Sequence, residues 1–103
     1  MMVPSAAMFK KNKDVYRDCL HDWFTYRGPV TTVLEKACPY IVAQRTLGSG
    51  LVVTMLPGYV DKYFDVITCV LSVYAEYARE PIMLKAGNDV YSFSTRKERY
   101  HGA

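Results

Sequence analysis

The chain lacks the marks of a secreted or membrane protein. Its three cysteines are an odd number with no repeated spacing, so they do not form the paired framework of a small disulfide-rich domain. Met1–Phe9 has no basic segment ahead of its short apolar run, unlike a secretory signal peptide. No segment reaches the roughly 18 consecutive apolar residues of a membrane span. We therefore expect a cytoplasmic protein with reduced thiols and no membrane contact.

Patterns for catalysis and metal binding are also missing. Cys19, His21 and Asp22 are the one place where nucleophile, base and acid types cluster, but helical residues two positions apart point about 200° away from each other. Cys19, Cys38 and Cys69 lack the short ligand spacing that pre-assembles a zinc site. We expect no enzymatic activity, catalytic residue, metal or cofactor. A small thiol-dependent enzyme around Cys19 and His21 is kept as the last alternative.

What the chain does have is enough apolar material for one folded domain. Half of its 103 residues are hydrophobic and 22% are charged, a balance typical of a globular protein. Tyr59–Glu80 repeats apolar residues at three- and four-residue steps, which predicts a core-facing helix. Val66, Cys69 and Val73 widen its apolar stripe beyond one contact surface. Such a helix is either covered on several sides or in contact with another chain.

Capping residues predict a helix near the N-terminus. Asn12 is a good N-cap for a helix that runs to about Arg27. Gly28 suits the left-handed position that follows a helix, and Pro29 prevents continuation. An apolar face on this segment indicates that the helix packs against the rest of the domain.

A hairpin is predicted near the C-terminus, after Pro81 ends the long helix. Ile82–Ala86 and Asp89–Ser94 flank Gly87-Asn88, which reads as a tight two-residue loop. This register places two apolar pairs on one side of the hairpin: Leu84 with Tyr91, and Ile82 with Phe93.

Residues 30–56 have two interpretations. Thr32 and Glu35 match a capping box, which predicts a helix beginning near Val33, but Pro39 costs about 3 kcal/mol inside a helix. Either the helix ends near Cys38 and residues 40–56 form a hairpin through Gly48-Ser49-Gly50, or the helix kinks or restarts at Pro39 and ends at Gly48. The second alternative leaves Leu51–Leu56 as a lone strand. We favour the hairpin, and whether 39–47 is strand or helix stays open. With Arg45 as the exception, the hairpin places apolar residues on one face: Ile41, Ala43, Leu47, Leu51, Val53 and Met55.

The predicted architecture is α+β. We expect a small two-layer domain in which an antiparallel sheet of three or four strands packs on the long central helix, with an additional N-terminal helix and the order α-α-β-β-α-β-β. Residues 1–11 form a flexible tail, residues 12–95 the domain, and residues 96–103 a basic tail. The open sheet leaves an edge where a second copy or a partner can pair.

Aromatic and basic side chains are the remaining signals for function. Tyrosine, tryptophan and arginine are the usual anchors of protein interfaces, and the chain has nine tyrosines. The protein-contact candidates are Trp23, Tyr26, Tyr59, Tyr77 and Tyr91. Net charge is +3, but the basic residues gather at the two ends, where weak nucleic-acid contact is expected. The nucleic-acid-contact candidates are Lys10, Lys11, Lys13, Arg96, Lys97, Arg99 and Tyr100.

These signals predict a small non-enzymatic interaction protein that binds another macromolecule. A protein partner is expected, and self-association as a homodimer would use the long helix or the sheet edge. Compact domains of this kind are common among regulators and phage- or virus-encoded inhibitors. The alternative is a nucleic-acid-associated accessory protein that uses its basic termini.

Overall fold

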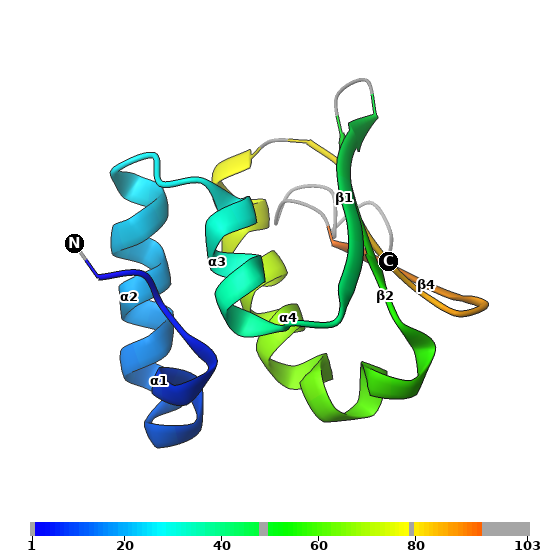
Figure 1. Ribbon diagram of the computed structural model, residues 1–103. Helices are drawn as coiled ribbons and strands as arrows, with labels where there is room; N and C mark the ends of the chain where they lie inside the picture. The colour runs from blue at the N-terminus through cyan, green and yellow to red at the C-terminus, as the bar shows by residue number, and fades with distance from the viewer. Residues whose placement is uncertain (1, 48–49, 79, 94–103) are drawn as a thin grey trace, which may run out of the picture.

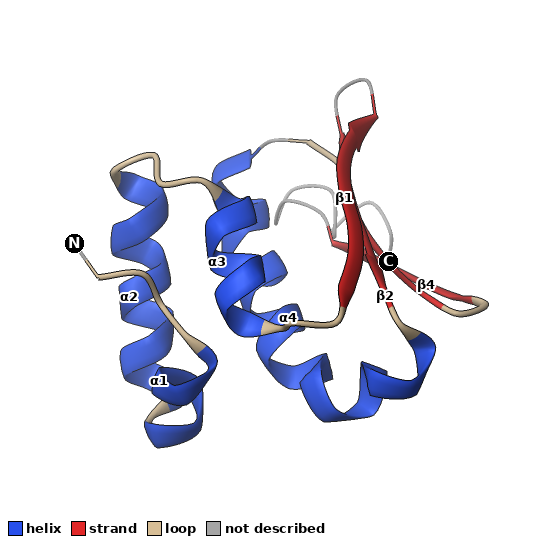
Figure 2. Cartoon of the chain, in the orientation of Figure 1, coloured by secondary structure: helices blue, strands red, loops and turns tan. Residues whose placement is uncertain are grey.

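The structure is a computed structural model that describes residues 2–47, 50–78 and 80–93. Four described strands form one sheet in the order β1-β2-β3-β4, and the described helices all lie on one side of it (Figures 1 and 2). The predicted α+β architecture, with a sheet packed on a long helix, is confirmed. The elements follow along the chain as α1 (Ala6–Lys11), α2 (Lys13–Thr25), α3 (Val30–Ala37), β1 (Ile41–Leu47), β2 (Gly50–Met55), η1 (Pro57–Tyr59), α4 (Val60–Ala78), β3 (Ile82–Ala86) and β4 (Asp89–Phe93).

The sheet is mixed rather than antiparallel, which corrects the prediction for one strand pair. β1 with β2 and β3 with β4 are antiparallel, whereas β2 and β3 run parallel, with Leu51 paired to Ile82 and Met55 to Ala86. α4 separates these two strands and, at 19 residues, spans about 28 Å. The helix carries the chain back to the end of the sheet where β2 began, and β3 must therefore start beside the start of β2.

The first predicted helix is confirmed as α2, with a correction at its C-terminus. The Asn12 side chain accepts hydrogen bonds from the amides of Asp14 and Val15 at 3.0 and 3.1 Å. At the other end, Arg27 takes the left-handed conformation, with φ at 62°. Its amide donates to the Phe24 carbonyl and the Gly28 amide donates to the Trp23 carbonyl, at 3.0 and 2.8 Å. This pair of bonds is a Schellman motif.

Gly28 therefore follows the left-handed residue instead of occupying that position. A Cβ atom at Gly28 would overlap the indole ring of Trp23. The same indole donates from Nε1 to the carbonyl of Pro29 at 3.0 Å. Glycine is needed here because the Trp23 indole packs over the turn. Sequence periodicity does not predict this contact.

In residues 30–47 and 50–56 the short helix α3 is followed by β1 and β2, which pair as the favoured hairpin predicts, while the predicted turn at Gly48-Ser49 lies outside the described residues. α3 begins at Val30, earlier than predicted, with Pro29 at the N-cap and no side-chain capping bond. The capping box of Thr32 and Glu35 is therefore not used. A register shift between Ile41 and Ala43 pairs Ala43 with Thr54, while Val53 pairs with Gln44. This β-bulge interrupts the single face predicted for the hairpin.

The C-terminal hairpin has the predicted register. Leu84 pairs with Tyr91 and Ile82 with Phe93. Gly87 has φ at 64°, a conformation that glycine adopts without a steric penalty. The tight loop and the apolar pairs on one side of β3 and β4 are thus confirmed.

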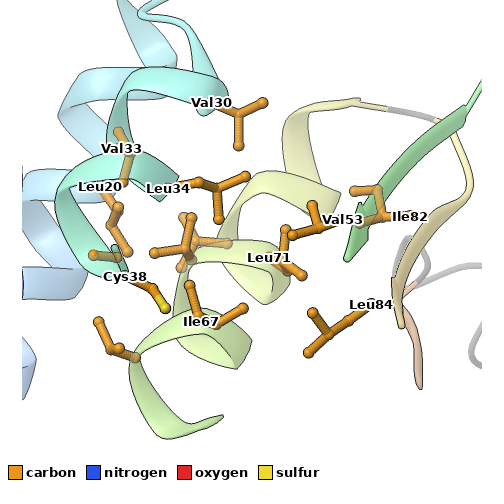
Figure 3. Packing of buried hydrophobic residues seen from close by; sticks show 14 of the residues in the cluster. Leu20, Val30, Val33, Leu34, Cys38, Val53, Ile67, Leu71, Ile82 and Leu84 are labelled. Atoms are coloured by element: carbon orange, nitrogen blue, oxygen red, sulfur yellow. The ribbon is translucent and has the colours of Figure 1, made fainter. Parts of the chain in front are cut away.

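α4 is covered on several sides by its own chain. α2 and α3 pack on it from one direction and the sheet from the other. Leu71 lies between Leu34 of α3 and Val53 of β2, and Ile67 lies between Cys38 and Leu84 (Figure 3). Val66 and Val73, which widen the apolar stripe, are buried. The width of this stripe is therefore accounted for inside the chain and does not require a second copy.

The two predicted tails have different outcomes. Residues 1–11 were expected to be flexible, but they include α1, which packs against α2. The Phe9 ring is partly buried against the core and meets the buried Tyr16 ring edge-on, with centroids 5.4 Å apart. The predicted basic tail, residues 96–103, lies outside the described residues.

Candidate functional site

Two of the five protein-contact candidates, Trp23 and Tyr91, pack against other parts of the same chain. Trp23 is half-buried over Gly28 and bonded to Pro29. Tyr91 is half-buried on β4, where its ring meets Phe64 of α4 edge-on at 5.0 Å. Both side chains hold elements together, which explains their aromatic character without a partner.

Tyr77 joins α4 to α2. Its hydroxyl lies 2.9 Å from Nδ1 of His21 and 3.3 Å from the Thr25 hydroxyl, and its ring contacts Phe24 with centroids 6.0 Å apart. The ring is still 41% exposed. Tyr26, at the end of α2, is 73% exposed and is the most accessible of the five candidates.

Tyr59 belongs to a cluster that we call the tyrosine platform, made of Tyr40, Tyr59 and Tyr63. The rings of Tyr40 and Tyr59 stack with centroids 3.6 Å apart and planes 4° from parallel. Tyr63 lies beside them, 5.7 Å from Tyr40 at a tilt of 53°. The Tyr59 phenol raises the pKa of Tyr40, because ionising both would place like charges together. Tyr59 is 38% exposed and the neighbouring Leu56 is 43% exposed.

The tertiary structure creates this platform. Tyr40 precedes β1, whereas Tyr59 ends η1 and Tyr63 lies one turn into α4. The Leu56 amide donates to the Tyr40 carbonyl at 3.1 Å, which closes the β1–β2 hairpin and brings η1 beside Tyr40. The sequence points only to Tyr59, because it leaves open whether residues 39–47 form the strand whose pairing with β2 brings Tyr40 beside Tyr59.

An open groove runs between α2 and α4, with a volume of about 350 Å³. We call it the α2–α4 groove. One wall carries Phe9, Lys13 and Arg17, and the other carries Asp65, Thr68, Cys69 and Ser72. Of these residues, only Lys13 was a candidate from the sequence, and only as a nucleic-acid contact.

The α2–α4 groove follows from the direction of the two helices. Arg17 lies close to Cys69, and one to two turns later Phe24 lies against Tyr74 at 5.2 Å. α2 and α4 therefore run side by side in the same direction. Polar residues at three- and four-residue steps form one wall of the groove on each helix. Sequence periodicity predicts such a polar face for each helix alone, but it does not predict that the two faces lie opposite each other.

Burial acts on two of the three thiols, those of Cys38 and Cys69. Burial raises the pKa of Cys38 above its ordinary 9.0, although the Tyr40 amide donates to its sulfur at 3.3 Å. Burial also raises the pKa of Cys69, against the opposing effect of Arg17 and Lys13. A raised pKa keeps a thiol protonated at neutral pH, and the thiolate is the reactive form. His21, two residues from Cys19, shares a hydrogen bond between its Nδ1 atom and the Tyr77 hydroxyl, at 2.9 Å.

The described part of the basic termini lies on α1 and the start of α2. Lys10, Lys11 and Lys13 are exposed, and the Lys13 ammonium stands 5.4 Å from the Phe9 ring centroid. The other nucleic-acid-contact candidates, Arg96, Lys97, Arg99 and Tyr100, lie outside the described residues. Nucleic-acid contact through the two basic termini therefore stays a prediction.

None of the helices within the described ranges is long and apolar enough to cross a membrane. In the same ranges, no group of three or more histidine, cysteine, aspartate or glutamate side chains is arranged to hold a metal ion. Comparison of the chain with protein-family models, with curated proteins and with solved structures finds no match.

Proposed function

We propose that this protein is a small non-enzymatic domain that binds another protein chain through the tyrosine platform, and that a second copy of the chain is its first partner. The observation that carries the proposal is the stacked pair of Tyr40 and Tyr59, partly exposed beside Leu56. Aromatic side chains are the most frequent interface anchors. Stacking holds these rings in place before binding, which lowers the entropy lost on association.

The platform replaces the long helix as the expected contact surface. The central aliphatic residues of α4, among them Ile67, Val70 and Leu71, are buried against α2, α3 and the sheet, so they are not available to a partner. A domain that occupies a partner's surface, as regulators and inhibitors do, needs only such a patch and no catalytic group.

The first test is the solution mass by light scattering across a dilution series, at low and high salt, with nucleic-acid absorbance read on the same peak. We expect a dimer that is insensitive to salt, because aromatic contacts do not depend on charge. Tyr59→Ala should weaken association by roughly tenfold, the loss of about 1.4 kcal/mol.

Tyr26→Ala is the matched control, since it removes an equally large and more exposed ring far from the platform. Thermal melts of both variants separate loss of binding from loss of fold. A monomeric mass at every concentration would contradict self-association. Equal weakening by the two variants would show that the platform is not the contact surface.

A further inference from the structure

The α2–α4 groove carries two cations on one wall. Lys13 and Arg17 are four residues apart on α2, so they lie on the same face of the helix. A guanidinium presents several donors in a planar fork, and an ammonium presents three, and together they suit the oxygens of a phosphate group.

The facing wall on α4 offers both donors and acceptors. Ser72 has a hydroxyl that can donate to an anion. The Thr68 hydroxyl already donates to the Asp65 carbonyl at 3.1 Å, so toward a ligand its oxygen can act as an acceptor. The Asp65 carboxylate is also an acceptor and would repel a bare anion.

This mixture fits a ligand with two kinds of polar group. A phosphate would lie against Arg17 and Lys13, while hydroxyl groups on the same molecule would donate to Asp65 and Thr68. The Phe9 ring supplies an apolar surface for the carbon skeleton between them. At about 350 Å³, the groove is near the lower limit of roughly 300–1,000 Å³ for small-molecule sites.

We propose that the α2–α4 groove binds a small phosphorylated polyhydroxy compound of the sugar-phosphate class. The site is separate from the proposed function, because it shares no residue with the tyrosine platform. A protein ligand is disfavoured at this position because the walls are polar and charged, and the groove is short.

The test is a titration of the isotope-labelled full chain with ribose 5-phosphate, followed by backbone amide shifts in NMR spectra. Inorganic phosphate and ribose serve as fragment probes. We expect saturable shifts around Arg17, Cys69 and Ser72 with ribose 5-phosphate, weaker shifts with phosphate, and none with ribose. Arg17→Gln should weaken binding by about tenfold or more, since it removes a charge-assisted hydrogen bond.

Arg27→Gln is the control, because it makes the same chemical change on an exposed arginine outside the groove. Ser72→Ala provides a second groove variant if Arg17→Gln fails to fold. The proposal is overturned by an absence of saturable shifts with ribose 5-phosphate, by equal binding of ribose, or by equal affinities of the two arginine variants. Tighter binding of a short single-stranded oligonucleotide at the same amides would replace the small molecule with a nucleic acid.

Discussion

At the scale of single residues, Tyr16 stands out because it is fully buried with an unused hydroxyl. Among the described residues, its Oη is the buried side-chain polar atom that has no hydrogen-bond partner. The side chain lies between α2 and α4, near the thiols of Cys69 and Cys19, and burial is the main reason that its pKa lies well above the ordinary 10.0. An unpaired buried hydroxyl costs stability, whereas the ring around it contributes to the core.

Tyr16→Phe should therefore raise the free energy of unfolding by about 1 kcal/mol, because it keeps the ring and removes the unpaired hydroxyl. Urea denaturation of the two proteins measures the difference. Tyr77→Phe is the matched control and should lower stability by about 1 kcal/mol, since its hydroxyl bonds to His21. Destabilisation by Tyr16→Phe would mean that the hydroxyl has a stabilising contact.

At the scale of elements, the end of α2 shows that a motif can form with an unfavourable residue in it. The Schellman motif is complete, yet its left-handed position is occupied by Arg27 and the following position by Gly28. The left-handed conformation costs roughly 1–2 kcal/mol for a residue with a Cβ atom. Trp23 requires the glycine one position later, so two adjacent positions favour glycine for different reasons.

Arg27→Gly should stabilise the protein by about 1 kcal/mol and raise the melting temperature by roughly 4–8 °C, because glycine removes the left-handed penalty. Gly28→Ala should lower the melting temperature, because its Cβ would displace the Trp23 ring from the turn. Circular dichroism melts of both variants check the pair. A fall in melting temperature for Arg27→Gly would show that the arginine side chain makes a contact worth more than the strain.

At the scale of the whole molecule, the core keeps several weak acids protonated. Burial is the main cause that raises the pKa of Cys38 and Cys69 above 9.0 and of Tyr16 and Tyr74 above 10.0. In the unfolded chain these groups return to their ordinary values. Above pH 9.0 the unfolded state thus binds fewer protons than the folded state, and the free energy of unfolding falls as pH rises.

We expect stability to be steady at neutral pH and to decline progressively from about pH 9 upward, as the unfolded thiols and then the unfolded phenols ionise. Urea midpoints at a series of pH values measure this decline. Tyr16→Phe should flatten the part of the curve above pH 10, because it removes one of the groups with a raised pKa. A curve that rises from about pH 9 to pH 11 would contradict the assignment of these groups as buried and neutral.

The sequence by itself determined the elements whose signals are local. The Asn12 cap, the period of α4 and the Gly87-Asn88 loop each depend on residues within a few positions of one another, so each is readable from the chain. The α+β class follows from their order. The break at Pro39 favoured the β1–β2 hairpin, but the bulge near Ile41 depends on how the two strands pair.

Only the tertiary structure decided how distant segments meet. α4 returns the chain to the start of β2, which makes β2 and β3 parallel, and it is covered by α2 and α3, which removes the need for a second chain at its apolar stripe. The closed hairpin stacks Tyr40 on Tyr59, and the parallel course of α2 and α4 sets Arg17 opposite Cys69 and Ser72. These contacts join residues far apart in sequence, where periodicity and capping carry no information about distance or direction.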